Sequence, residues 1–170
     1  MDALASRVEE ELKSRLAEVV RESLRRVELQ RVEGTYVYAR NYDLLKYRVA
    51  KAIASSLSVI DCLEGVYYAD IASGEYITGQ VYFGRDVDVI VLLDEGGCPW
   101  APGLLKRVER VANAVIAEVA KREGAGWLAD IAETNGVVEI HFDDIYVKMV
   151  RDKKSRGSLS DLNVIEVTQR

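Results

Sequence analysis

The chain has 170 residues, 49% of them hydrophobic and 30% charged, which is the composition of one folded domain rather than of a disordered chain. Its formal net charge of −5 gives no overall attraction to nucleic acid, so any such contact would have to be local. Two cysteines and a single histidine exclude a disulfide framework and a four-ligand zinc site, and they leave little material for a Ser-His-Asp triad. We expect Cys62 and Cys98 to have no special role.

The composition also gives expectations about where in the cell the protein is found and what kind of organism it comes from. No apolar run reaches 18 residues and the first residues are too charged for a signal peptide, so we expect a cytoplasmic protein with no membrane contact. Asn, Gln, Cys and His are sparse while Glu, Arg and Lys are abundant, a balance typical of proteins from heat-adapted organisms.

The first predicted element is a long amphipathic helix over residues 2–28. Its apolar residues recur at helical spacing with charged residues between them, so one face is apolar and the other is solvated. These apolar residues are Leu4, Val8, Leu12, Leu16, Val19, Val20, Leu24 and Val27. We expect the apolar face to cover the domain's own core. The other interpretation is a docking face for a second copy of the chain or for a helical protein partner.

Strands and helices then follow one another along the chain. Gly34 interrupts the first helix, the alternating segment 35–40 predicts a short strand, and a helix over 42–57 follows with Asn41 as its N-cap. The segment 65–72 predicts a strand, and the glycine-punctuated residues 73–84 predict a turn region.

The next strand is the apolar part of "GRDVDVIVLL", residues 84–93, which is followed by a Gly- and Pro-rich loop over 94–103. A helix is predicted from about residue 104 to 122. After a Gly-rich break, "VVEIHF" (137–142) and "IYVKMV" (145–150) predict a tight antiparallel hairpin, because only Asp143 and Asp144 separate them.

This order of elements predicts an α+β fold, with a small mixed sheet and helices packed on one side of it. We expect an N-terminal helix over 1–32 packed on the core, a central domain over 33–152 and a polar C-terminal tail over 153–170.

Two carboxylates open the strand that otherwise looks buried. Side chains alternate along a strand, so Asp86 and Asp88 point to the same face, about 6–7 Å apart along the backbone. Two like charges side by side on a sheet cost stability unless a positive charge lies between them. A third carboxylate, Glu139, stands alone in the later apolar segment 137–142, and a small-residue turn that includes Ser73 and Gly74 precedes Asp86.

This arrangement resembles the nucleotidyltransferase superfamily related to DNA polymerase beta, which includes CCA-adding enzymes, poly(A) polymerases and minimal nucleotidyltransferases. The family pattern is a Gly-Ser turn after a strand, then an acidic–apolar–acidic triplet opening an apolar strand, then a third acidic residue on a following strand. The resemblance covers about residues 42–150. The chain departs from the pattern at the turn, where Ala72-Ser73 or Ser73-Gly74 replaces Gly-Ser.

The resemblance implies an enzyme that moves a nucleoside monophosphate from a nucleoside triphosphate, such as ATP, to an acceptor hydroxyl and releases pyrophosphate. Asp86, Asp88 and Glu139 are then the catalytic ligands of Mg²⁺ or Mn²⁺, which prefer such hard oxygen ligands. Ser73 and Gly74 would hold the triphosphate, and Arg85 would neutralise it.

Several alternatives stay open at this point. Asp143 and Asp144 compete with Glu139 as the third carboxylate, and His141, two residues after Glu139, either helps to position a phosphate or is a surface histidine. The basic residues of segment 148–156 are either a solvated tail or a contact to RNA or triphosphate, so the acceptor could be RNA or protein. The second function hypothesis is a non-catalytic nucleotidyltransferase-like subunit that binds a partner.

Overall fold

The sheet at the centre of the protein has four strands in the order β7-β6-β3-β8. The computed structural model describes residues 2–32, 36–69, 76–77, 80–81, 86–94, 98–157 and 164–169. The four strands are β3 (Leu63–Ala69), β6 (Val87–Leu93), β7 (Val138–His141) and β8 (Val164–Glu166). Strand β3 pairs antiparallel with both β6 and β8, whereas β7 pairs parallel with β6. The sheet is therefore mixed, and the protein is α+β as predicted.

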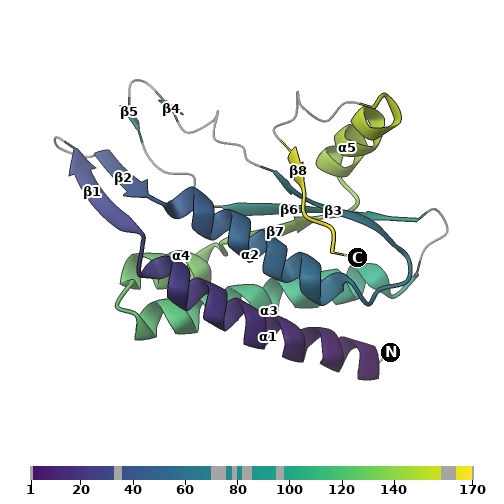
Figure 1. The fold of residues 1–170 in the computed structure, drawn as a ribbon, viewed down its shortest axis with the longest axis horizontal. Helices are drawn as coiled ribbons and strands as arrows, with labels where there is room; N and C mark the ends of the chain where they lie inside the picture. The colour runs from purple at the N-terminus through teal and green to yellow at the C-terminus, as the bar shows by residue number, and fades with distance from the viewer. Residues whose placement is uncertain are drawn as a thin grey trace.

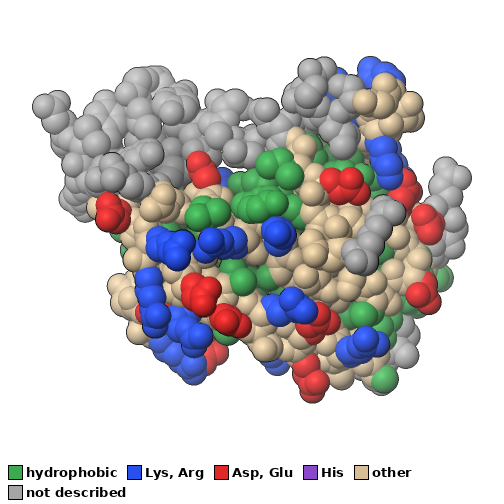
Figure 2. Space-filling model, in the orientation of Figure 1, with side chains coloured by type: hydrophobic (Ala, Val, Ile, Leu, Met, Phe, Trp, Pro, Cys, Tyr) green, Lys and Arg blue, Asp and Glu red, His purple; other side chains and the backbone are tan. Residues whose placement is uncertain are grey.

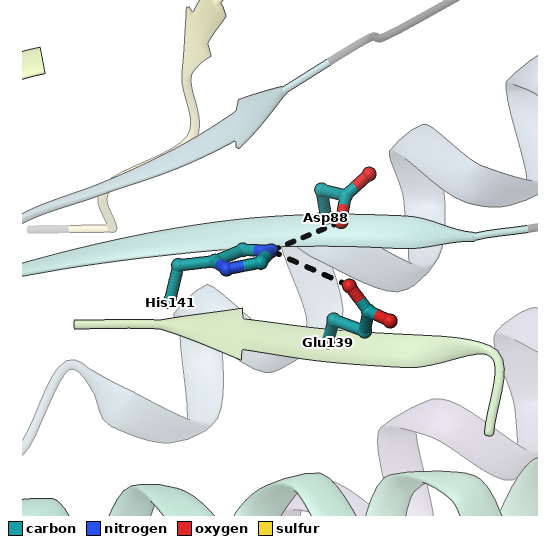
Figure 3. Close-up of side chains that lie close together, drawn as sticks. All are labelled: Asp88, Glu139 and His141. Atoms are coloured by element: carbon teal, nitrogen blue, oxygen red, sulfur yellow. Dashed lines mark hydrogen bonds and ion pairs between the residues drawn. The ribbon is translucent and has the colours of Figure 1, made fainter. Parts of the chain in front are cut away.

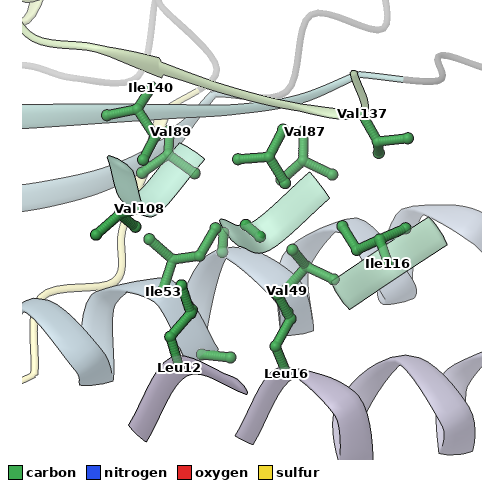
Figure 4. Packing of buried hydrophobic residues seen from close by; sticks show 14 of the residues in the cluster. Leu12, Leu16, Val49, Ile53, Val87, Val89, Val108, Ile116, Val137 and Ile140 are labelled. Carbon is green, nitrogen blue, oxygen red and sulfur yellow. The ribbon is translucent and has the colours of Figure 1, made fainter. Parts of the chain in front are cut away.

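Four helices lie on one side of this sheet (Figure 1). They are α1 (Asp2–Leu24), α2 (Tyr42–Leu57), α3 (Ala101–Arg122) and α4 (Gly126–Thr134). Two of them, α2 and α3, pack against the sheet, and the other two, α1 and α4, pack against these helices. Val87 and Val89 of β6 pack with residues of the helices in one continuous core, as Figure 4 shows.

The opposite face of the sheet carries a fifth helix, α5 (Ile145–Ser155). Val147 and Val150 of α5 pack there against Tyr67, Ile90 and Leu92. Strand β6 is thus covered on both faces, which explains its nearly continuous run of Val, Ile and Leu. The prediction that all helices lie on one side of the sheet is wrong because of α5.

The predicted hairpin over 137–150 is also wrong in its second half. Its first segment forms β7, but residues 145–150 belong to α5. The Asp144 side chain accepts hydrogen bonds from the backbone N–H groups of Tyr146 and Val147, which is the geometry of a helix N-cap. After β7 the chain leaves the sheet and enters α5 instead of turning back beside β7.

Other boundaries differ from the sequence-based expectation. The first helix ends at Leu24, four residues early, and its predicted end instead lies in β1 (Glu28–Val32), which pairs with β2 (Tyr36–Arg40). Helix α4 lies in the expected Gly-rich break, α3 begins at Ala101 with Pro102 in its first turn, and β8 lies within the expected tail. Strand β2 and helix α2 occur where they were predicted.

Two short strands, β4 (Tyr76–Ile77) and β5 (Gln80–Val81), form a separate antiparallel pair in the predicted turn region. Asn41 precedes α2 as expected but does not cap it with its side chain. Its amide instead donates a hydrogen bond to the carbonyl of Arg26, at 2.9 Å, and its backbone adopts φ 67°.

The apolar stripe of α1 is used inside the protein, since Val8, Leu12, Leu16 and Val20 are fully buried in the core. On the outer side, a groove of about 500 Å³ between α1 and α2 is bordered by charges of both signs. Its charged residues are Arg15, Glu18, Glu22, Arg26, Arg48 and Lys51, and Figure 2 shows Lys and Arg mixed with Asp and Glu over these helices. Any partner of α1 would therefore meet a charged surface. Within the described residues, no helix combines the length and apolar character that crossing a bilayer requires.

A disulfide bond joins Cys62, just before β3, to Cys98, just before α3. The expectation that these cysteines have no role is therefore wrong. Sequence spacing gave no sign of the pair, because 36 residues separate the two cysteines and the antiparallel pairing of β3 with β6 brings them together.

We predict that removing the disulfide in the double variant Cys62→Ser/Cys98→Ser lowers the free energy of unfolding by about 4 kcal/mol, the loop-closure value for a 36-residue separation. Urea titration with and without a reductant measures this. Reductant should destabilise the wild type and leave the double variant unchanged. Equal stability of the oxidised wild type and the double variant would contradict the prediction.

Candidate metal centre

The site is built by the parallel register of β6 and β7. Asp88 lies directly opposite Glu139, and Ile90 lies opposite His141. Because side chains alternate along each strand, Asp88, Glu139 and His141 all point to the face that carries α5. Their neighbours Val87, Val89, Val138 and Ile140 point the other way, into the helix-covered core.

The three polar side chains meet at one point on that face, as Figure 3 shows. His141 Nε2 lies 3.0 Å from Asp88 Oδ1 and 3.7 Å from Glu139 Oε2. One ligand atom from each residue lies within 4.8 Å of the others. Asp88 is 7% exposed, whereas the Glu139 side chain is 50% exposed, so the cluster is buried at one end and open to solvent at the other.

Asp144 fixes the histidine from the other side. Its Oδ2 lies 2.6 Å from His141 Nδ1, while its Oδ1 accepts the backbone N–H groups of Tyr146 and Val147 at 2.9 and 3.2 Å. The Tyr146 ring lies against the imidazole, with centroids 4.5 Å apart. The N-terminus of α5 and the orientation of His141 thus depend on one carboxylate.

The charges within the cluster influence one another. Burial, with the nearby charges of Asp88 and Asp86, raises the pKa of Glu139 above its ordinary value. Burial alone would lower the pKa of His141, but hydrogen bonds with Asp88 and Asp144 outweigh it and raise the pKa to about 9. At neutral pH the imidazole is therefore protonated and donates from both nitrogens, which supplies the positive charge that the carboxylates require.

Strand β7 is held in place by two side chains of α3. Asn113 Oδ1 accepts hydrogen bonds from the backbone N–H groups of Val137 and Val138 at 2.6 and 2.8 Å, and Asn113 Nδ2 donates to the carbonyl of Val138 at 3.1 Å. Glu109 Oε2 accepts the N–H of Ile140 at 2.8 Å. These bonds satisfy polar groups on the free edge of β7 and thereby set the positions of Glu139 and His141.

The structure brings together two of the three predicted ligands, Asp88 and Glu139. Asp86 lies exposed immediately before β6, and its charge reaches Glu139, as the raised pKa of Glu139 reflects. Ser73, Gly74 and Arg85 lie outside the described residues. Of the two competitors for the third carboxylate, Asp143 is exposed, and Asp144 contacts His141 rather than the other carboxylates.

The sequence interpretation undervalued His141, whose side chain is only 14% exposed. The sequence did indicate that His141 could belong to the site, because side chains alternate along a strand and Glu139 and His141 therefore lie on the same face of β7. The bond between His141 and Asp144 was hidden by the prediction that residues 145–150 form a strand.

Comparisons with protein-family models, with curated proteins and with solved structures gave no match for this chain.

We predict that the free energy of unfolding, measured without divalent cations, falls as pH rises from about 6.5 to 9. The pKa of His141 is higher in the folded state than its ordinary value of 6.5, so its stabilising contribution is complete below that value and is lost as pH rises through about 9. The loss should be about 1–3 kcal/mol. Urea unfolding across this range measures it, and His141→Gln should flatten the profile. An equally steep fall in His141→Gln would contradict the assignment.

We predict that Asn113→Ala destabilises the protein by about 2–4 kcal/mol, because the N–H groups of Val137 and Val138 lose their acceptor. Asn113→Asp, which keeps acceptor oxygens, should cost less, and Lys106→Ala on the exposed side of α3 serves as the control. Thermal or urea unfolding measures the three variants. If Asn113→Ala unfolds like the Lys106 control, β7 does not depend on this side chain.

Proposed function

We propose that the protein is a divalent-metal-dependent nucleotidyltransferase, which moves a nucleoside monophosphate from a nucleoside triphosphate to an acceptor hydroxyl and releases pyrophosphate. One observation carries the proposal: Asp88 and Glu139 lie opposite each other on adjacent parallel strands with their carboxylates on the same face. The resemblance to the DNA polymerase beta superfamily implies that the third acidic residue lies on a neighbouring strand and shares a metal ion with the first two.

The residues fit a divalent cation. Carboxylate oxygens are the ligands that Mg²⁺ and Mn²⁺ take, and a few of them suffice when substrate phosphates and waters complete the shell. The raised pKa of Glu139 reflects repulsion from Asp88 and Asp86 as well as burial, and a bound cation would relieve that repulsion. Asp86, Asp88 and Glu139 are the ligands in this proposal.

A bound metal ion would supply Lewis-acid stabilisation of charge on the phosphate oxygens. The chain's own groups would do the rest. The half-exposed carboxylate of Glu139 would accept the proton of the attacking hydroxyl, whose oxygen then bonds to the α-phosphorus as the bond to the β-phosphate oxygen breaks. Asp88, held by His141 at 3.0 Å, would keep its position through this step.

The substrate-binding part of the proposal comes from the sequence. Ser73, Gly74 and Arg85 would contact the triphosphate, and exposed Lys148 on α5 is available to a phosphate of an RNA acceptor. Other members of that basic segment have internal partners: Lys154 pairs with Glu64 at 3.0 Å, and Arg151 donates to the carbonyl of Leu93.

The second candidate is a non-catalytic nucleotidyltransferase-like subunit, and a specific contact favours it. Protonated His141 already contacts the carboxylates of Asp88 and Glu139 and neutralises part of their charge without a metal ion. In that case the cluster would have a structural role, joining β6 to β7 and α5, and the protein would function by binding a partner at its surface.

Nucleotidyl transfer is tested with each α-labelled nucleoside triphosphate, Mg²⁺ or Mn²⁺, and RNA or protein acceptors, with pyrophosphate release as the readout. Glu139→Gln should lower the rate by about 100-fold or more, the usual contribution of a general base, and Asp88→Asn should abolish metal-dependent transfer. Asp94→Asn, at the far end of β6 and exposed, is the matched control. The proposal fails if wild type and Asp88→Asn agree in both activity and metal binding.

Thermal melting separates the two candidates. A nucleotide present at 100 times its dissociation constant stabilises a binding protein by about 2.7 kcal/mol. The enzyme should therefore melt higher with Mn²⁺ and at least one nucleoside triphosphate, whereas absence of a shift with every nucleotide would favour the non-catalytic subunit.

A further inference from the structure

The metal ligands expected from the sequence, Asp86, Asp88 and Glu139, offer only oxygen atoms. The cluster in the structure also offers a nitrogen atom, from His141. His141 Nε2 is directed at Asp88 Oδ1 and Glu139 Oε2 from 3.0 and 3.7 Å. Two ligands bound at about 2.1 Å to one ion lie at most about 4.2 Å apart. Both separations from His141 Nε2 fall within this limit, and one ligand atom from each of the three residues lies within 4.8 Å of the others.

The orientation of the imidazole ring is also fixed by residues outside the cluster. Asp144 binds Nδ1 at 2.6 Å, and the same carboxylate is anchored to the backbone of α5 through Tyr146 and Val147. Metal-bound histidines in proteins commonly have this partner, a carboxylate on the second ring nitrogen that fixes the tautomer and aims the first nitrogen at the ion. Tyr146 packs on the ring and limits its rotation.

Burial adds an independent observation. The Asp88 side chain is only 11% exposed, and its Oδ1 lies 3.0 Å from His141 Nε2 inside the cluster. A buried carboxylate is costly unless it is hydrogen-bonded, paired with a charge or bound to a metal ion, and a cation held by the three side chains would supply such a partner.

We propose that Asp88, Glu139 and His141 form a mixed nitrogen–oxygen site for a transition-metal dication of the Mn²⁺ or Zn²⁺ class rather than a site for Mg²⁺ or Ca²⁺. Zn²⁺ and other transition metals commonly bind imidazole nitrogen, and Mn²⁺ also binds carboxylates. Mg²⁺ and Ca²⁺ bind oxygen ligands almost exclusively. The inference rests on the proposed function, which already assigns Asp88 and Glu139 as metal ligands. It differs in the ion that these residues bind and in adding His141 as the ligand that selects this ion.

The first measurement is titration of the full chain, stripped with a chelator, with Mn²⁺, Zn²⁺, Mg²⁺ and Ca²⁺ separately in a calorimeter. Wild type should bind Mn²⁺ and Zn²⁺ at least about 10–100-fold more tightly than Mg²⁺, the size of effect that a tuned ligand shell confers. Equal affinity for Mg²⁺ and Mn²⁺, or no binding of any of these ions, would overturn the proposal.

The second measurement identifies the ligand directly. Pulsed electron paramagnetic resonance of the Mn²⁺ complex should show coupling to a ¹⁴N nucleus, and this coupling should vanish in His141→Gln. That variant should lose Mn²⁺ and Zn²⁺ affinity by at least about 10-fold and retain whatever Mg²⁺ affinity the wild type has. Asp143→Asn, which removes an exposed carboxylate outside the cluster, is the control and should match wild type. Circular dichroism verifies that each variant is folded, and His141→Asn replaces His141→Gln if the latter is not.

The outcomes separate this inference from the proposed function. Nitrogen coupling without nucleotidyl transfer under any condition would support the metal assignment and overturn the enzyme. Transfer with Mg²⁺, together with unchanged metal selectivity in His141→Gln, would support the enzyme and overturn the nitrogen ligand.

Discussion

The parallel pairing of β6 with β7 is the constraint on which the site depends. With Asp88 opposite Glu139, two carboxylates share a face, and the next outward residue of β7, His141, meets them from the side. A shift of β7 by one residue against β6 would turn Glu139 and His141 towards the apolar core and away from Asp88. The side chain of Asn113, from helix α3, holds the outer edge of β7 through two hydrogen bonds. A residue on the helix-covered side of the sheet thus helps to position Glu139 and His141 on the opposite face.

The sequence determined best those features that depend on a single periodicity. Alternation along β6 is unambiguous, because Val87, Val89 and Val91 enter one core and Ile90 and Leu92 the other, so the strand and the direction of Asp88 could be predicted. The apolar stripe of α2 was equally clear. The meeting of Glu139 with Asp88 needed one further assumption, that their strands are neighbours, and the structure bears that out.

The features that could not be predicted depend on tertiary contacts or fit two periodicities at once. In segment 145–150, the apolar residues satisfy a strand's spacing as well as a helix's. The N-cap hydrogen bonds of Asp144 and the packing of Val147 and Val150 against the sheet favour the helix. Strand β8 has only three residues, Val164–Glu166, and it forms by pairing with the edge of β3. The disulfide joins residues that pairing between β3 and β6 brings close, which spacing in the chain does not reveal.

Asp144 serves two neighbours with one side chain, the imidazole of His141 and the first turn of α5. Its position in the sequence is therefore subject to two selective pressures at the same time. A mutation to Ser or Asn would still begin the helix yet alter the ring's partner, whereas Glu would keep the charge but misfit the turn. Drift at this position should accordingly be slow in related chains, and where Asp144 has been replaced, residue 141 should have changed with it.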